Sequence, residues 1–225
     1  MMSGQVIAID GPAASGKSST AAAVARALGF VHLDSGSLYR ALTWVSVHRR
    51  VDDPAGIIAE AESLHVGLQT AGGGLALHID GGGDIEQAIR ATDVNASVSA
   101  IAAMPALRDW VNARIREAIE RLPGAVIDGR DIGTVVVPDA QLKVFLTATA
   151  AARAERRLMQ RGGEVDRRLL EAETADLVER DRRDAGRVTA PLKEPPDAVR
   201  IDTTGLSFDQ QVGRIVDLAR ERRLV

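Results

Sequence analysis

The eight residues from Gly11 to Ser18 read GPAASGKS, which matches the pattern GxxxxGK[ST]. In this pattern the glycines let successive backbone N–H groups turn towards phosphate oxygens, and the start of the following helix adds partial positive charge. Lys17 would reach the β- and γ-phosphates, and the hydroxyl of Ser18 can bind Mg²⁺. We therefore predict a nucleoside triphosphate site with Ser18 as a Mg²⁺ ligand. The residues predicted to hold the triphosphate are Gly11, Pro12, Ala13, Ala14, Ser15, Gly16, Lys17, Ser18 and Ser19.

Two further polar segments offer groups for a second substrate. One reads DSGSLYR from Asp34, and the other reads DGRDIG from Asp128. Arg40 and Arg130 are suited to bidentate capture of a phosphate. Ser35 can hydrogen-bond an anionic oxygen, and Asp128 could hold the Mg²⁺ shell through water. Taken singly, each side chain could instead be a loop cap or part of a surface ion pair. Their joint position after buried strands favours a second binding site.

Hydrophobic runs of strand length alternate with helical patterns along the chain. Five runs bounded by Gly, Asp or Pro are predicted to be strands, at 6–10, 31–33, 125–128, 142–147 and 198–202. Helices are predicted at 18–28, 37–50, 105–122, 150–161, 169–183 and 207–224. This alternation predicts an α/β domain with a five-stranded parallel sheet flanked by helices. Since ligands bind outside the carboxyl ends of parallel strands, the polar segments would lie together at one edge.

The stretch 64–89 breaks this alternation. It holds seven of the 21 glycines, six of them in two clusters at 72–74 and 81–83, around an alternating hydrophobic run at 75–79. Alternation between glycine turns is typical of two short antiparallel strands. We therefore predict a small antiparallel β insert in the α/β domain.

Composition and charge exclude several classes of protein. The chain has 225 residues, of which 45% are hydrophobic and 26% charged, so it is long enough for one packed domain and is not mainly disordered. There is no cysteine, and no apolar run of about 18 residues that could span a membrane. The net charge is −3, and between 153 and 187 ten arginines are offset by nine acidic residues. We expect no nucleic-acid partner, no membrane and a cytoplasmic location.

Two other kinds of site are disfavoured by the motifs. Guanine-specific switch proteins need an Asn/Thr-Lys-x-Asp base reader, but Lys143 and Lys193 both follow leucine. The four histidines, at 32, 48, 65 and 78, show no metal-ligand spacing and are interpreted as structural.

Five motifs in this order resemble those of the bacterial cytidylate kinase family: GPAASGKS, DSGSLYRA, MPALRDW, DGRDIGTVV and RDRRDAGRVTAPL. The resemblance runs from Val6 to about Gln211. It implies the P-loop kinase fold of the nucleoside monophosphate kinases, with a helical lid and, at 64–89, the insert peculiar to bacterial members. The single P-loop kinase domain, 1–225, would contain a monophosphate-binding region at 37–122, including the insert, and a lid region at 150–187.

The same resemblance implies an activity and residue roles. The γ-phosphoryl group of ATP would pass to CMP or dCMP, giving ADP and CDP or dCDP, in pyrimidine nucleotide metabolism, with Mg²⁺ as cofactor and the protein a monomer. The acceptor would be held at its phosphate by Ser35, Arg40, Arg130 and Arg187, at cytosine by Ser99, Arg108 and Asp131, and at the pentose by Arg180 and Asp184. The catalytic residues would be Lys17, Asp128, Arg130 and Arg157. Because the segment 159–166 is compressed against the family pattern, it stays open which of Arg153, Arg157 and Arg161 act as lid arginines.

Such a transfer needs no general base, since the second pKa of a phosphate monoester is about 6 and the acceptor is largely dianionic at neutral pH. Alignment and charge neutralisation would be the chemistry. One alternative is a kinase for another small acceptor, such as UMP or an alcohol, for which Asp34 or Asp131 could be the base. Another is a regulatory protein that binds ATP and phosphorylates nothing.

Overall fold

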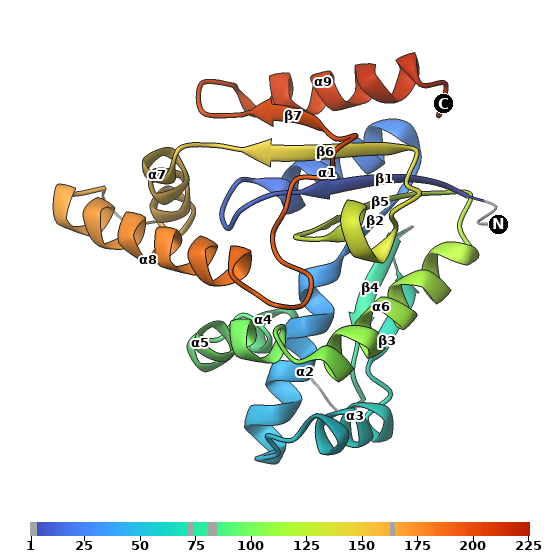
Figure 1. The fold of residues 1–225 in the computed structure, drawn as a ribbon, viewed down its shortest axis with the longest axis vertical. Helices are drawn as coiled ribbons and strands as arrows, with labels where there is room; N and C mark the ends of the chain where they lie inside the picture. Colours follow the sequence, from blue (N-terminus) through green and yellow to red (C-terminus); the bar gives the residue numbers. More distant parts are fainter. Residues whose placement is uncertain (1–3, 72–73, 81–84, 163–164) are drawn as a thin grey trace.

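The computed structural model describes residues 4–71, 74–80, 85–162 and 165–225 (Figure 1). Five parallel strands form the central sheet in the order β2-β5-β1-β6-β7. They are β1 (Gln5–Asp10), β2 (Val31–Asp34), β5 (Gly124–Gly129), β6 (Leu142–Thr147) and β7 (Val199–Asp202). The predicted five-stranded parallel sheet is confirmed, and every strand begins and ends within one residue of its expected bounds.

The two faces of the sheet enter separate hydrophobic cores. In β1, Ala8 packs with α2 (Ser35–Arg49) and α6 (Pro105–Glu120) on one face. The next side chain, Ile9, packs with α1 (Lys17–Leu28) and α9 (Phe208–Glu221) on the other. Because successive side chains of a strand point to opposite faces, a parallel sheet of apolar strands has to be covered on both. Figure 1 shows α1 and α9 on one side of the sheet and α2 and α6 on the other.

All six predicted helices are present, as α1, α2, α6, α7 (Ala150–Gln160), α8 (Arg167–Ala185) and α9. Helix α2 begins two residues earlier than predicted, because the carboxylate of Asp34 accepts a hydrogen bond from the N–H of Gly36 and caps the helix there. The capping box expected at the start of α9 is formed by Ser207 and Gln210.

Four elements were not predicted from the sequence. They are α3 (Pro54–Ser63), α4 (Ile85–Ala88), α5 (Thr92–Ile101) and the π-helical turn η1 (Ile132–Val136). Helix α3 has both usual start signals, since Asp53 caps it through the N–H of Gly56 and Pro54 occupies its first turn. Helix α5 buries Val94, Val98 and Ile101, one stripe at helical spacing. Both helices therefore have local signals in the sequence.

The antiparallel insert is confirmed as β3 (Gly67–Ala71) paired with β4 (Gly74–His78). Its expected glycine turns at 72–73 and 81–83 lie outside the described residues. Val66, Leu77 and Ile79 are buried in the same core as α2 and α6. The hairpin is therefore packed into the main domain.

Helices α7 and α8 pack against each other and project beyond the carboxyl ends of β1 and β6 (Figure 1). Arg153 of α7 donates to the carbonyl oxygen of Ala13 at 2.7 Å and pairs with Asp181 of α8 at 2.7 Å. Asp181 in turn accepts a hydrogen bond from the N–H of Ala13 at 3.0 Å. These contacts tie α7 and α8 to the loop after β1.

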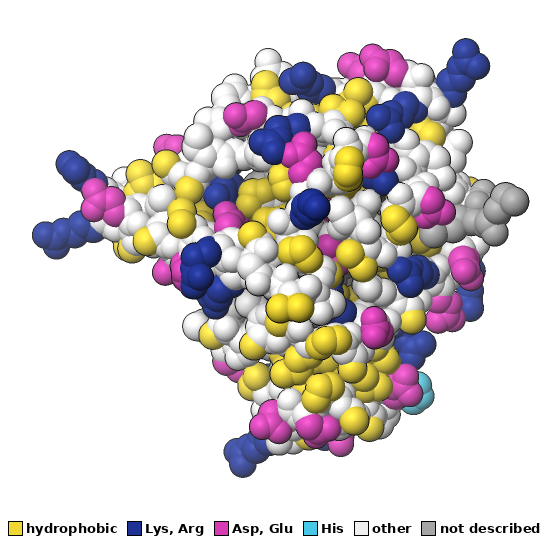
Figure 2. Space-filling model, in the orientation of Figure 1, with side chains coloured by type: hydrophobic (Ala, Val, Ile, Leu, Met, Phe, Trp, Pro, Cys, Tyr) yellow, Lys and Arg dark blue, Asp and Glu magenta, His cyan; other side chains and the backbone are white. Residues whose placement is uncertain are grey.

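The surface carries charges of both signs. Figure 2 shows basic and acidic side chains interspersed over one face, with no continuous basic stripe on that face. Within the described ranges, no helix has both the length and the apolar composition that crossing a bilayer requires.

Candidate active site

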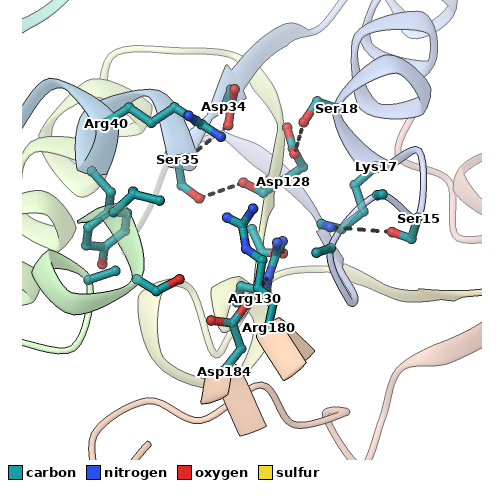
Figure 3. A pocket seen from close by; sticks show the side chains of 18 of the residues that line it. Ser15, Lys17, Ser18, Asp34, Ser35, Arg40, Asp128, Arg130, Arg180 and Asp184 are labelled. Carbon is teal, nitrogen blue, oxygen red and sulfur yellow. Dashed lines mark hydrogen bonds and ion pairs between the residues drawn. The ribbon is translucent and has the colours of Figure 1, made fainter. Parts of the chain in front are cut away.

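A cavity of about 420 Å³ lies between the loop after β1 and helices α2, α5, α7 and α8. Its volume is in the range of small-molecule sites, about 300–1,000 Å³. Figure 3 shows side chains from these elements converging on it. The predicted site residues that line it are Ala13, Ala14, Ser15, Gly16, Lys17, Ser18, Ser19, Ser35, Arg40, Ser99, Arg108, Asp128, Arg130, Asp131, Arg157, Arg180, Asp184 and Arg187. Gly11 and Pro12, which are also described, do not line it.

The loop from Gly11 to Gly16 has the backbone shape of a phosphate cradle. Gly16 has φ +84°, a left-handed conformation that glycine adopts without strain, and it directly precedes α1. A side chain at Gly11 would place its Cβ 2.1 Å from the carbonyl oxygen of Leu146. In the described structure no side chain caps α1, so the free N–H groups of its first turn remain available to an anion.

Lys17 is buried at the base of this loop, with 5% of its surface exposed. Its Nζ donates to the carbonyl oxygen of Pro12 at 2.7 Å and to Oγ of Ser15 at 3.4 Å. Burial, and then the charge of Arg130, lower the pKa of Lys17 well below its ordinary value. A bound polyphosphate would favour its charged form again.

Ser18 and Asp128 place side-chain oxygen atoms close together at the cavity, where they could bind a cation. Ser18 Oγ donates to Oδ2 of Asp128 at 2.6 Å, and Asp128 is only 2% exposed. Mg²⁺ prefers such hard oxygen ligands and commonly takes one or two protein groups, with waters and substrate phosphates completing its shell. The pair fits a cation held together with ATP. In the part of the chain described, no three His, Cys, Asp or Glu side chains gather into a cage for a metal.

Eight arginines line the cavity: Arg40, Arg90, Arg108, Arg130, Arg156, Arg157, Arg180 and Arg187. Burial, and then the charge of Arg130, lower the pKa of Arg180 to about 10. Burial, and then the charge of Arg90, lower the pKa of Arg40. Figure 3 shows the guanidinium groups of Arg130 and Arg180 reaching into the same space. Mutually repelling cations around a cavity form a site that a bound polyanion stabilises.

Asp184 connects several of these groups. It is 1% exposed, accepts a hydrogen bond from Nε of Arg130 at 3.0 Å and also pairs with Arg187. Arg40 is held by the side-chain oxygen of Asn95 at 2.7 Å. Carboxylate and amide acceptors therefore hold the arginines in place while leaving other donors directed at the cavity.

The cavity is also lined by Ser99, Arg108, Asp131 and Tyr39. Arg108 and Asp131 form a buried ion pair, and Arg108 also donates to the carbonyl oxygen of Ala102 at 2.8 Å. Burial raises the pKa of Asp131, and the charge of Arg108 opposes that shift. Among the described residues, the hydroxyl of Tyr39 and Nε of Arg108 are buried without a hydrogen-bond partner. These residues offer a planar ligand one acceptor group and several donors.

The three candidate lid arginines lie in different environments. Arg153 is 5% exposed and holds the loop at Ala13, outside the cavity lining. Arg157 lines the cavity and pairs with Glu173 at 2.8 Å. Arg161 pairs with the same carboxylate at 2.8 Å and is outside the lining. Of the three, Arg157 is placed to meet a ligand.

Comparison with known proteins agrees with this geometry. The model of the family described as "Cytidylate kinase" matches residues 7–221. The chain belongs to the cytidylate kinase family. A curated cytidylate kinase from Chromobacterium violaceum is 43% identical over 220 residues, which cover 97% of this chain and 96% of that one. The "Bifunctional pantoate ligase/cytidylate kinase" of Synechococcus sp. (strain CC9902) is 44% identical over 223 residues.

In that second relative the match covers 96% of this chain but 45% of the longer one, so this chain spans about half its length. Among solved structures, a shikimate kinase from Bacteroides thetaiotaomicron is 15% identical with a TM-score of 0.44, covering 96% of this chain and 98% of that one. That likeness is too weak to inform activity.

Other residues line the cavity of this cytidylate kinase family member without having been predicted to bind substrate. Arg90 follows α4 and lies 4.0 Å from the carboxylate of Asp34. Arg156 and Gln160 of α7 also line the cavity. Arg90 carries no motif signal, and it reaches the site only because the chain after the hairpin folds back over α2. Asp34 begins the motif DSGSLYR at the end of β2, so its position at the cavity could be predicted from the sequence.

Proposed function

We propose that this protein transfers the γ-phosphoryl group of ATP to CMP or dCMP, giving ADP and CDP or dCDP. The observation that carries the proposal is the buried pair Arg108–Asp131 in the lining of the cavity. Cytosine presents an amino donor beside a ring-nitrogen acceptor, so it matches a carboxylate next to a guanidinium. Uracil presents the reverse order and would set its carbonyl oxygen against the carboxylate. Membership of the cytidylate kinase family supports the same substrate.

In the proposed reaction the protein aligns two anions and neutralises their charge. Lys17 would contact the β- and γ-phosphates on one side, and Arg130 and Arg157 would contact the transferred phosphoryl group on the acceptor side. Mg²⁺, held through Ser18 and Asp128, would supply further charge neutralisation on the phosphates. The acceptor phosphate is the nucleophile and is already dianionic at neutral pH, so no side chain has to remove a proton.

The roles of the surrounding regions are also proposals. Residues 37–122 would bind the monophosphate, with Ser35 and Arg40 at their edge, and residues 150–187 would close as a lid. Closure would exclude water, which otherwise competes with CMP for the γ-phosphoryl group. We propose that the protein acts as a monomer in the cytoplasm.

An alcohol-phosphorylating kinase is the less favoured alternative. Its acceptor would need a base, and both candidates are already engaged. Asp34 caps α2 through the N–H of Gly36 at 2.9 Å, and Asp131 pairs with Arg108. Neither carboxylate is free to accept a proton from a bound hydroxyl without breaking a structural contact.

The test is an assay of ADP release from MgATP with CMP, dCMP, UMP, AMP or water as the acceptor. We expect CMP and dCMP to support turnover, with UMP and AMP at least about 100-fold slower in kcat/KM. A faster reaction with UMP would favour the alternative acceptor. ADP release that does not depend on any acceptor would identify an ATPase, and no release at all would leave a protein that only binds ATP.

A further inference from the structure

His32 contacts the carboxylate that we place in the Mg²⁺ site. Its Nε2 lies 2.8 Å from Oδ1 of Asp128, while the other oxygen of Asp128 accepts the hydroxyl proton of Ser18 at 2.6 Å. Asp128 is 2% exposed, and both of its oxygens are therefore occupied by specific donors in a nearly water-free place. The side chain of His32 is 25% exposed and is outside the cavity lining, so it acts from behind the site.

The register of β2 and β5 explains how His32 reaches this position. Asp34 is paired with Asp128, and His32 is paired with Val126, two residues earlier. Side chains two apart share a face of the sheet, so His32, Asp34 and Asp128 all lie on the face that α1 covers. Two carboxylates on neighbouring strands repel each other, and the imidazole supplies an N–H donor at Oδ1 of Asp128.

Three groups thus form a chain from the back of the sheet to the cavity. A neutral imidazole has one N–H, and here it can donate to Asp128. The opposite oxygen of Asp128 accepts a hydrogen bond from the hydroxyl of Ser18, so the lone pairs of Ser18 Oγ stay free for a cation. If Asp128 turned away, Ser18 would lose its acceptor, and its oxygen would no longer be held for a cation.

We propose that His32 is a positioning residue that acts through Asp128 to hold the oxygen ligands of the nucleotide-bound divalent cation. The proposal rests on the proposed function in so far as it takes Ser18 and Asp128 as the metal site. It assigns His32 no contact with either substrate. It also departs from the interpretation of all four histidines as merely structural.

The test measures cation binding directly, without an acceptor and without turnover. Mn²⁺ is titrated into the protein with ATP present and followed by the electron paramagnetic resonance signal of free Mn²⁺. We expect His32→Leu to weaken Mn²⁺ binding by about 10-fold, the lower end of the effect of removing a partner of a metal ligand. His32→Gln, whose amide can donate to the same carboxylate oxygen, is expected to stay within about 3-fold of the wild type.

Two controls separate positioning from folding. His48→Leu removes a histidine that bonds the carbonyl oxygen of Trp44 on α2, so it should bind Mn²⁺ like the wild type. Metal-free ATP binding and the KM for CMP should be unchanged in His32→Leu, because His32 touches neither substrate. A folded His32→Leu that binds Mn²⁺ like the wild type overturns the proposal, as does a folded His32→Gln that binds as weakly as His32→Leu. The Mn²⁺ titration and the assay of ADP release with CMP are independent measurements. The proposed function can therefore hold when the role of His32 fails, and can fail when the role of His32 holds.

Discussion

Arg108 and Asp131 form an ion pair in which only 2% of one side chain and 6% of the other are exposed. They come from α6 and from the segment after β5, two neighbouring parts of the chain, and are 23 positions apart in the sequence. A charged pair this deep is stable only while both partners are present, because the loss of either leaves a buried charge without a counterion. Its position on the wall of the cavity makes it a candidate reader of the nucleobase.

Asp131→Asn should narrow the preference for CMP over UMP. The amide keeps the shape of the carboxylate but adds a donor, so it can pair with the uracil oxygen, whereas the wild-type carboxylate cannot. A site that leaves a buried polar group unpaired can discriminate by as much as about 10⁴. We expect a lower kcat/KM for CMP and a smaller CMP/UMP ratio, measured by ADP release. Asp109→Asn, an equal change of charge at an exposed neighbour, should keep the wild-type ratio. An unchanged ratio in a folded Asp131→Asn would remove the basis for the cytosine assignment.

Lys17→Ala should lower kcat far more than it weakens binding of ATP. Its ammonium group is proposed to follow charge that develops on the transferred phosphoryl group, and loss of one such contact costs about 100-fold or more in kcat. Steady-state kinetics and ATP titration of the same preparation would measure the two effects. The matched control is Lys193→Ala, since Lys193 is exposed and outside the cavity. Near-full turnover of a folded Lys17→Ala would contradict this role.

Arg90→Gln should raise the KM for CMP by about 3- to 10-fold and leave the affinity for ATP unchanged. Arg90 lines the cavity beside Asp34 and Arg40, so it is placed to contact the acceptor. Because its charge is exposed, its contribution to the affinity for the acceptor should be modest. Arg121→Gln removes a charge that pairs with Glu117 away from the cavity and should leave both constants as they are. If the KM for CMP does not change in Arg90→Gln, Arg90 does not contact the acceptor.

Asp10 should give the stability of the protein a specific dependence on pH. Its carboxylate is 1% exposed and accepts hydrogen bonds from the N–H groups of Ile132 and Gly133, both at 2.8 Å. Burial raises the pKa of Asp10 from 3.8 to about 6, so between these values the folded state holds a proton that the unfolded chain has released. The resulting stabilisation is complete below the lower value and is lost as pH rises through about 6.

The measurement is urea unfolding of the wild type and Asp10→Asn between about pH 4 and pH 7. A shift of about two pKa units corresponds to about 3 kcal/mol, by which the free energy of unfolding of the wild type should fall relative to the variant over this range. A difference that is the same at every pH would show that Asp10 does not titrate in this interval.

The sheet could be predicted because its signals are local. Each strand is a short apolar run bounded by Gly, Asp or Pro, and the phosphate loop is a spaced pattern that specifies its own backbone shape. Helix α5 has an equally local signal, the stripe of Val94, Val98 and Ile101, and was missed for want of a stronger start signal. The π-helical turn η1 has no such pattern, because the acceptor for its first N–H groups is Asp10, more than 120 residues earlier.

The same difference between local and long-range signals decides which site residues could be predicted. Residues inside spaced motifs, such as Lys17 and Asp131, could be proposed from the sequence and lie on one cavity. The different contacts of Arg153 and Arg157 could not be predicted from the sequence, because both residues belong to one arginine-rich helix with the same local pattern. Only the packing of α8 brings Asp181 to Arg153 and leaves Arg157 beside the cavity. His32 depends in the same way on the register between β2 and β5.

The most direct test of the central claim is to follow the γ-phosphoryl group itself. The protein is incubated with Mg²⁺, CMP and ATP labelled with ³²P at the γ-position, and the products are separated by chromatography. We expect the label to appear in CDP in an amount equal to the ADP formed, and dCMP to give labelled dCDP. Label recovered as inorganic phosphate, or label that passes to UMP in preference to CMP, would contradict this expectation.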